Sequence, residues 1–396
     1  MTRRRILVTD GTQRSALAVV RSLGRAGHTV FVCGPRVPSL AGSSKHSFAE
    51  SIVASALDAP AQFVGDVSHL IERWRIDTVI PITEASLLAL LPERESLGAM
   101  IPWPDLDTFR AVSDKKTMLA TAASLGFAIP KQMVLNSDAD VRAMDPTLLD
   151  YPLVLKPARS VSEHEGQRVS LGVIHVASPS ALRRAITALG HAAFPILVQQ
   201  RIVGPGIGIF LLMWDGKVLA TFAHERLREK PPSGGVSVYS QSVAADVELV
   251  ERSRLLLETM KWRGVAMVEF KRDARTGVAY LMEVNGRFWG SLQLAIDSGV
   301  DFPALLIAAA SGETIAATSG YRVGTRSRWW WGDVDHLLAR WRKDAATLAL
   351  PAGAPSRWRA TLDFLTFWHP HDHNEVFRLK DPRPFLRETI EWLHRR

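Results

Sequence analysis

The chain has 396 residues, 47% of them hydrophobic and 22% charged, and its formal net charge is +8. This length predicts two or three domains, and no apolar run approaches the ~20 residues that cross a bilayer, which excludes an integral membrane protein. The single cysteine, Cys33, excludes an internal disulfide and a zinc site built from cysteines. Because the apolar run after Arg5 is broken at Thr9, a signal peptide is not expected, and we predict a cytoplasmic protein.

The positive charge is concentrated near the C-terminus. Residues 320–396 contain 14 Lys and Arg against 9 Asp and Glu, a difference of +5, and seven of the 12 tryptophans. We expect these tryptophans to pack a small helical layer onto the main body, as large aromatic side chains usually do. Weak peripheral contact with an anionic membrane stays open as an alternative, whereas no nucleic acid is expected as a partner.

The first part of the chain alternates between predicted strands and helices. The run "RRILVTDG" ends in a turn, and "SALAVVRSLGRAGHTVFVCG" continues as an amphipathic helix and a strand at 29–33. Another strand is predicted at 78–82, before a helix that opens at Thr83 and Glu84. This order predicts a doubly wound parallel sheet over residues 1–110. The turn "DGTQRSA" lacks G-x-G-x-x-G, so NAD binding is not expected.

A Pro-rich joint, "PWPDLDTF", precedes a helix with lysines in its first turn. In "SDKKTMLATAASLGFAIP", Ser113 is a suitable N-cap and Gly126 a suitable C-terminal stop, so Lys115 lies near the start of the helix. Beyond it the sequence changes mainly to strands. A helix is predicted at 179–189 and a hairpin turn at Asp215-Gly216.

Two later strands, "GVAMVEFKRD" and "YLMEVNGRFWGS", are predicted to pair through the turn between them. If residues 274–278 form the loop, Glu269 and Glu283 face each other and Asn285 lies one step along the same face. Like charges directly opposite one another destabilise a hairpin unless a cation lies between them. These oxygen ligands suit Mg²⁺, and no His or Cys is present in the hairpin to favour zinc.

A solvated sheet face is the alternative, because Lys271, Arg272 and Arg287 are near enough in sequence to neutralise both carboxylates. The other face of the first strand carries Val268 and Phe270, which predicts an apolar layer beneath the acidic pair. We therefore expect a central hairpin. From these residues alone, both the cation site and the ion-paired surface stay open.

Cationic residues also occur beside two predicted loops. Lys156 ends the apolar strand "YPLVLKP", where a lone ammonium is costly to bury unless an anion accompanies it. The polar loop "ARSVSEHEGQRVSLG" after it is suited to a flap over a ligand. In "REKPPSGGVS", Gly234 and Gly235 offer backbone donors close to Arg226 and Arg228.

These features occur in the order typical of the ATP-grasp superfamily. The stretches "SDKKTMLATAASLGFAIP", "YPLVLKP", "ILVQQRIVG" and "VEFKRD…YLMEVNGRFWGS" resemble its two lysine motifs, its hinge and its metal-binding hairpin. The chain resembles a carbamoyl-phosphate-synthetase-like carboxylate–amine ligase up to about Ser311. The implied fold is α/β and α+β: a Rossmann-like pre-ATP-grasp domain at 1–110, an ATP-grasp domain at 111–315 (lid subdomain about 111–195, metal and ATP subdomain about 196–315), and a mainly helical extension at 316–396.

The resemblance implies which residues bind ATP and which react. Lys115 and Lys156 would bind its phosphates, and the hinge residues would line the adenine, with Gln in place of the usual hinge Glu. The loop after Lys156 also lacks the family's usual Gly run. The ATP-binding set is therefore Lys115, Lys156, Gln200, Arg201, Ile202, Glu269 and Glu283.

The metal, catalytic and substrate residues follow from the same motifs. Glu269, Glu283 and Asn285 would hold two Mg²⁺, with Mn²⁺ as an option, while Arg287 and Lys156 would act on the transferred phosphoryl group. The substrate candidates, which come from the residues of the second flap rather than from the family, are Arg226, Arg228, Gly234 and Gly235.

The resemblance implies an ATP- and Mg²⁺-dependent ligase that activates a carboxylate as an acyl phosphate for attack by an amine. Such chemistry depends on positioning and charge neutralisation, so the lack of a Ser or Cys nucleophile is consistent with it. The expected partners are a small carboxylate and a small amine, and a homodimer stays open. The alternatives are a carboxylase, a phosphotransferase, and an ATP-switched module that docks to a membrane or nucleic acid through its C-terminal region. The stretch "HPHDH", with His369, Asp372 and His373, is expected to be a polar turn rather than a metal site.

Overall fold

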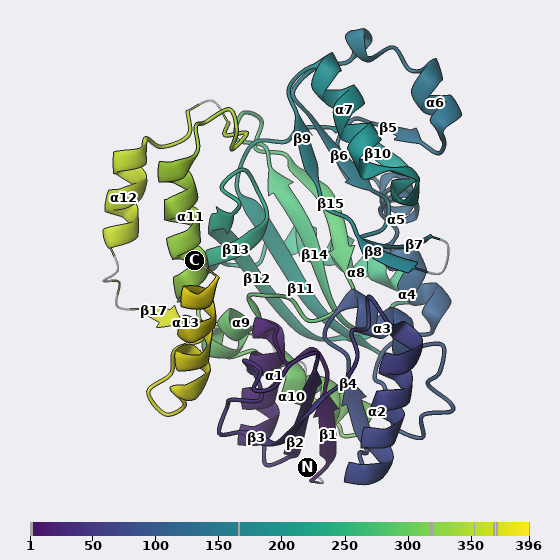
Figure 1. The fold of residues 1–396 in the computed structure, drawn as a ribbon, viewed down its shortest axis with the longest axis vertical. Coiled ribbons are helices and arrows are strands. Elements are labelled where there is room, and N and C mark those ends of the chain that lie inside the picture. The colour runs from purple at the N-terminus through teal and green to yellow at the C-terminus, as the bar shows by residue number, and fades with distance from the viewer. Residues whose placement is uncertain are drawn as a thin grey trace.

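The computed structural model describes residues 3–164, 167–316, 320–351, 353–366, 369 and 371–395. These residues form two four-stranded sheets, a seven-stranded sheet and a two-stranded hairpin. The N-terminal sheet lies at one end of the molecule, the second four-stranded sheet at the opposite end, and the seven-stranded sheet between them (Figure 1).

The N-terminal sheet is parallel, with the strand order β3-β2-β1-β4, as predicted for a doubly wound domain. Its buried strands are apolar; a helix connects β1 to β2 and another connects β3 to β4, whereas a loop joins β2 to β3. The predicted strand at 78–82 ends at Ile80, because Pro81 has no backbone N–H for the ladder. The elements are β1 (Arg5–Val8), α1 (Arg14–Arg25), β2 (Thr29–Gly34), β3 (Ser47–Ile52), α2 (Pro60–Trp74), β4 (Thr78–Ile80) and α3 (Glu84–Leu90).

Two consecutive helices, α4 (Leu106–Ser113) and α5 (Lys115–Ser124), lead to the second sheet. The predicted N-cap is wrong by one residue: Ser113 ends α4, and Asp114 caps α5 by accepting a hydrogen bond from Thr117 N at 3.0 Å. Asp satisfies the free N–H groups of a helix start as well as Ser does. Lys115 is thus the first residue of α5.

The second sheet is antiparallel, with the order β5-β10-β6-β9 and a small core of its own. Helix α7 spans the residues predicted for it, and the polar loop after Lys156 forms the hairpin β7–β8. The elements are β5 (Gln132–Leu135), α6 (Asp138–Ala143), β6 (Leu153–Pro157), β7 (Val161–His164), β8 (Gln167–Ser170), β9 (Ile174–Val176), α7 (Pro179–Leu189) and β10 (Ile196–Gln200), with short 3-10 turns at Pro146–Leu148 and His191–Ala193.

The seven-stranded sheet has the order β15-β14-β11-β12-β13-β16-β17. The turn at Asp215 and Gly216, with φ of 48° and 73°, is the two-residue hairpin turn that was predicted. The expectation of a central acidic hairpin is wrong, because β15 is an edge strand. The elements are β11 (Gly206–Trp214), β12 (Lys217–Lys230), β13 (Val236–Ser242), α8 (Val247–Thr259), β14 (Gly264–Arg272), β15 (Ala279–Asn285), α9 (Leu292–Ser298) and α10 (Phe302–Ala310).

The C-terminal region contains the helices α11 (Trp330–Arg342), α12 (Arg357–Leu365) and α13 (Arg383–His394). It is not only helical, since β16 (Arg326–Arg328) and β17 (Asp372–Asn374) complete the large sheet.

Tryptophans and a buried ion pair dock this region onto the body. Trp331 and Trp392 stack on each other within the region, and Trp329 meets the body, with the guanidinium carbon of Arg14 3.9 Å from its ring centroid. The buried Arg21 of α1 donates to Asp381 Oδ2 at 2.8 Å. Because such a buried charge needs its partner, the two ends of the chain are held together.

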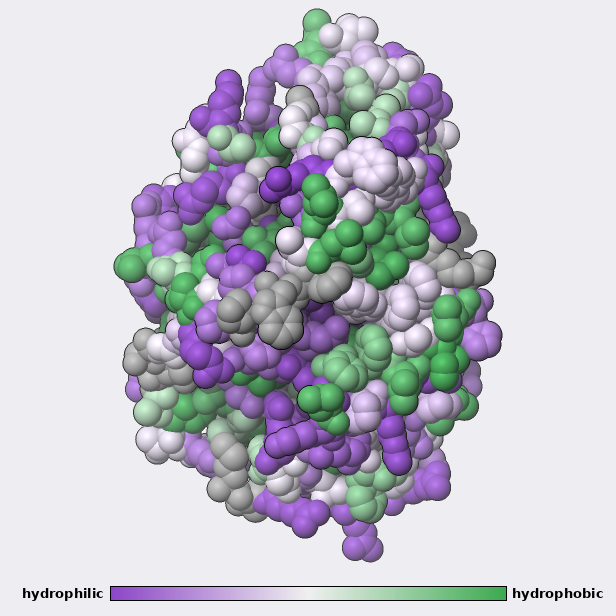
Figure 2. All heavy atoms as spheres, turned by 90° about the vertical axis from the view of Figure 1, so that its left-hand side faces the viewer, coloured by the Kyte–Doolittle hydropathy of each residue, from purple (hydrophilic) through white to green (hydrophobic). Residues whose placement is uncertain are grey.

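The outer face of the C-terminal region carries exposed apolar side chains. Figure 2 shows hydrophobic patches on this side, separated by hydrophilic residues. The exposed apolar residues of the last two helices are Trp358, Leu362, Leu365, Leu386, Ile390 and Leu393.

None of the helices in the described part of the chain is by itself long and apolar enough to span a bilayer. The pair α9 and α10 passes that test only together, with a bend of 89°, and most of its apolar side chains are buried in the core.

Candidate functional site

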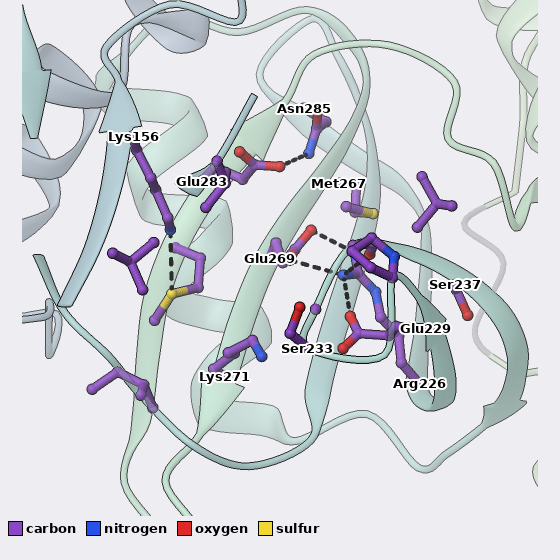
Figure 3. Close-up of a pocket in the computed structure, with 18 of the residues that line it drawn as sticks. Lys156, Arg226, Glu229, Ser233, Ser237, Met267, Glu269, Lys271, Glu283 and Asn285 are labelled. Carbon is purple, nitrogen blue, oxygen red and sulfur yellow. Dashed lines mark hydrogen bonds and ion pairs between the residues drawn. The ribbon is translucent and has the colours of Figure 1, made fainter. Parts of the chain in front are cut away.

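A cavity of about 420 Å³ lies between the second sheet and the seven-stranded sheet. Strands β6, β9 and β10 contribute one wall, and β12, β14 and β15 the other (Figure 3). The sequence candidates that line it are Lys156, Gln200, Arg201, Ile202, Arg226, Gly234, Gly235, Glu269, Glu283, Asn285 and Arg287. Lys115 lines a small adjoining pocket together with Glu283, Asn285 and Arg287.

The acidic hairpin has the predicted register at its centre. Glu269 faces Glu283, and Met267 faces Asn285. A bulge follows, so that Phe270 faces Leu281. The pairing of the two carboxylates is confirmed, whereas the predicted loop at 274–278 is wrong by one residue, because Arg272 faces Ala279 and the bulge makes up the difference.

Glu283 lies among cations and an amide. Asn285 Nδ2 donates to Glu283 Oε1 at 2.9 Å, and Lys115 Nζ is 3.5 Å from Glu283 Oε2. Burial alone would raise the pKa of Glu283, but Lys115 and Lys156 outweigh it and hold that pKa at about 2. Arg287 Nη2 donates to Asn285 Oδ1 at 3.2 Å and extends the network. Glu283 is therefore an anion at neutral pH.

Glu269 is paired differently. Arg226 donates to both of its oxygens and also to Glu229 Oε1 at 2.9 Å (Figure 3). Burial nevertheless raises the pKa of Glu269, and the neighbouring Glu283 adds to the rise. Glu229 was missed from the sequence. It lies three residues after Arg226, a spacing that did not suggest a shared face on a strand.

The hairpin fits Mg²⁺ by its donor chemistry. Glu269, Glu283 and Asn285 present carboxylate and amide oxygens on one face, and hard cations prefer such ligands, with phosphate or water completing the shell. Burial raises the pKa of Glu269 most, and repulsion from Glu283 across the hairpin adds to the rise; a divalent cation between the two carboxylates would relieve this repulsion.

The two lysines come from α5 and from the second sheet: Lys115 is the first residue of α5, and Lys156 lies on β6. Lys115 Nζ donates to Ser160 Oγ at 3.0 Å. Lys156 Nζ lies 3.7 Å from Met282 Sδ, a weak acceptor, and burial lowers the pKa of Lys156. An ammonium in that position is suited to an anionic ligand.

The hinge end of the cavity also contains residues that the sequence did not reveal. His175 on β9 lines it, and burial lowers the pKa of His175 to about 4, so its ring is neutral at neutral pH. Gln199 lines it as well and donates to Gln132 Oε1 at 2.7 Å. Gln199 belongs to the hinge stretch but was not singled out, and no signal in the sequence marked His175.

One substrate candidate does not reach the cavity. Arg228 is paired with the buried Asp333 of α11, to which its Nε donates at 2.7 Å. The pairing of β12 with β13 is irregular on both sides of Arg228, and such a bulge turns the side chain away from the face that Arg226 occupies. Arg228 as a substrate ligand is therefore wrong.

A second cavity, of about 500 Å³, extends from Arg287 to the loops of the N-terminal sheet. Asp10, Thr12, Arg14 and Glu84 are among the residues that line it. It leaves room for a second molecule next to the first cavity.

The stretch with His369, Asp372 and His373 is only partly the predicted polar turn, because Asp372 and His373 belong to strand β17, which pairs with β16. Asp372 accepts a hydrogen bond from Tyr239 Oη at 2.9 Å. Within the described ranges, no group of three His, Cys, Asp or Glu residues is arranged to hold a metal ion.

A parallel N-terminal domain, an antiparallel lid and a large sheet with an acidic hairpin together define the ATP-grasp fold. The family model for an ATP-grasp protein in the biosynthetic pathway with the Ter operon matches residues 193–329. An L-amino acid ligase from Bacillus licheniformis superposes with a TM-score of 0.61 at 19% identity, covering 78% of this chain and 74% of that one. The ADP complex of an N5-carboxyaminoimidazole ribonucleotide synthetase superposes with a TM-score of 0.61 at 18% identity, covering 82% of both chains. The resemblance to the ATP-grasp superfamily is thus confirmed in the fold.

Two curated proteins are similar in sequence. A putative D-alanine–D-lactate ligase of Streptomyces coelicolor is 28% identical over 232 residues, which are 53% of this chain and 63% of that protein. The vancomycin B-type resistance protein VanB of Enterococcus faecalis is 27% identical over 223 residues, 51% of this chain and 62% of that protein. The match spans less than two thirds of either relative.

Proposed function

We propose that this protein is an ATP- and Mg²⁺-dependent ligase that joins a small carboxylate to an amine. The observation that carries the proposal is the meeting of Glu269, Glu283 and Asn285 with Lys115, Lys156 and Arg287 around connected cavities. Phosphoryl transfer requires this combination of metal ligands and fixed cations more than it requires a nucleophile from the protein. The ligase names of similar proteins support the reaction class.

In the first step, Lys156 and Lys115 would bind the ATP phosphates, and the backbone at Gln200 to Ile202 would hold the adenine. Glu269, Glu283 and Asn285 would hold Mg²⁺, which when bound neutralises phosphate charge. An oxygen of the substrate carboxylate attacks the γ-phosphorus, and the bond from that phosphorus to the oxygen of ADP breaks. Arg287 faces the cavity where the resulting acyl phosphate would form.

In the second step, a neutral amine attacks the carbonyl carbon of the acyl phosphate. A C–N bond forms, the C–O bond to phosphate breaks with its electron pair leaving on phosphate, and the nitrogen loses a proton. The hairpin β7–β8 and the turn at Gly234 and Gly235 lie where they would exclude water from this intermediate.

A nucleotide-release screen tests the proposal. The purified chain is given Mg²⁺-ATP with pooled carboxylates, and with pooled amines and hydroxy acids as acceptors. We expect ADP and phosphate to be released only when a carboxylate and an acceptor are both present. Dependence on bicarbonate would show a carboxylase instead, and ADP without phosphate, together with a stable phosphorylated product, would show a phosphotransferase.

A further inference from the structure

A third cavity, of about 380 Å³, is lined mostly by residues outside the region that the family model matches, with Lys230 and Trp329 inside it. Its walls come from the loop that opens α1, from β12, and from helices α11 and α13 of the C-terminal region, which lie side by side in Figure 1. Thr12, Gln13 and Arg14 line both this cavity and the cavity of about 500 Å³ beside Arg287. The two cavities are therefore separated by one short loop.

Three indole rings line the third cavity: Trp329, Trp331 and Trp392. Trp331 and Trp392 are stacked, and Arg14 lies over Trp329 with its guanidinium carbon 3.9 Å from the ring centroid. Aromatic faces of this kind attract organic cations and also cover the apolar chain that carries them. The walls suit an amphipathic cation better than a polar anion.

Two buried carboxylates, Glu388 at this cavity and Glu375 behind it, each have one oxygen without a hydrogen-bond partner within the described residues. Glu388 Oε1 accepts a hydrogen bond from Trp329 Nε1 at 2.7 Å, whereas its Oε2 is buried and has no hydrogen-bond partner within the described residues. Arg14 donates to Glu375 behind it, which also has a buried oxygen without a partner there. Arg14 thus pairs directly with Glu375 and acts on Glu388 only through its charge, and burial raises the pKa of Glu375 to about 7 and also raises that of Glu388.

The other charges at this cavity already have partners. Lys230 pairs with Asp335, while Glu391 pairs with Arg36 and Arg395, whose side chains are 45% and 69% exposed. Arg395 lowers the pKa of Glu388 through its charge, but no hydrogen bond joins the two and solvent screens the exposed guanidinium, so the buried carboxylate is compensated only in part. Within the described residues, Glu388 Oε2 is therefore a buried acceptor without a hydrogen-bond donor.

We infer that this cavity binds a cationic group, an ammonium or a guanidinium, on an apolar stem, with Glu388 as its anion and the three indoles as its walls. The inference rests on the proposed ligase function in one respect: the cation would belong to the amine co-substrate. That co-substrate would then carry two nitrogens. One stays charged beside Glu388, and the other reaches past Arg14 to the cavity at Arg287 as the neutral nucleophile.

Binding is measured without ATP or Mg²⁺, so that the result does not depend on turnover. Isothermal titration uses 1,5-diaminopentane and butylguanidine as probes and 1-pentanol as the uncharged comparison. We expect both cations to bind and the alcohol not to. Glu388→Gln, which keeps the acceptor for Trp329, should weaken cation binding roughly tenfold, and Trp331→Leu should weaken it severalfold. Glu251→Gln on the exposed face of α8, which makes the same change in net charge, should leave it unchanged.

The outcomes separate the two proposals. Cation binding that Glu388→Gln weakens, in a protein with no ligase turnover, would support this site and overturn the proposed function. Absence of cation binding, or equal binding by wild type and Glu388→Gln, would overturn this inference even in an active ligase. Equal melting temperatures of the variants and the wild type establish that a loss of binding is not a loss of fold.

Discussion

Glu283→Gln should lower ATP turnover by at least about 100-fold, because it removes a charged ligand from the proposed Mg²⁺ site. The side chain keeps its size and can still accept from Asn285. What it loses is the anion that Lys115 and Lys156 hold ionised, with a pKa of about 2. Steady-state ADP release, measured across a range of Mg²⁺ concentrations, should show both a lower maximum and a higher Mg²⁺ requirement.

Glu251→Gln serves as the matched control, since Glu251 lies on α8 with its side chain 62% exposed. It should turn over ATP as the wild type does. Full activity of Glu283→Gln at an unchanged Mg²⁺ requirement would show that Glu283 is not a metal ligand. It would favour the alternative in which cationic side chains neutralise the carboxylates of the hairpin.

Lys156→Met should weaken ATP binding at least about tenfold, because its charge-assisted contact with phosphate is lost. The substitution keeps the length of the apolar stem in the wall of the cavity. The present neighbour of Nζ is a thioether sulfur at 3.7 Å, so little native hydrogen bonding is lost with the ammonium. Nucleotide binding is measured directly by titration calorimetry in the presence of Mg²⁺.

Lys131→Met is the comparison for this variant, since Lys131 has an 84% exposed side chain near the start of β5. Its affinity for ATP should equal that of the wild type. If Lys156→Met bound ATP as tightly as Lys131→Met does, Lys156 would not be a phosphate ligand.

The acidic hairpin was predictable in outline because a short loop limits its register. The turn was placed one residue off, since Arg272 rather than Asp273 faces Ala279, and Glu269 faces Glu283 because a bulge between Glu269 and Phe270 shifts the register back by one residue. That β15 lies at the sheet edge was not predictable, because the position of a strand in a sheet depends on the other strands rather than on its own alternation.

For Arg226 and Arg228, the alternation of side chains along a regular strand predicts the wrong face for one residue. Two residues apart on a regular strand, they would share a face, and both were predicted to meet a substrate. The irregular pairing around Arg228 sends it to Asp333, while Arg226 reaches Glu269. A bulge depends on the partner strand, so β12 alone did not reveal it.

The C-terminal region was predictable in composition but not in position. Trp329 and Trp331 pack as expected, whereas Trp358 is exposed. The cavity at Glu388 joins residues near positions 13 and 390, and long-range pairing of this kind leaves no local pattern. The same holds for Glu375, which meets Arg14 from the other end of the chain.

The central claim is that a carboxylate is activated by phosphorylation, and oxygen transfer tests it most directly. The carboxylate found in the screen is labelled with ¹⁸O in both oxygens and turned over with ATP and its amine. If an acyl phosphate forms, the oxygen that attacked phosphorus leaves with it, and mass spectrometry should find one ¹⁸O atom in each released phosphate. Phosphate free of ¹⁸O, formed alongside labelled product, would contradict the account.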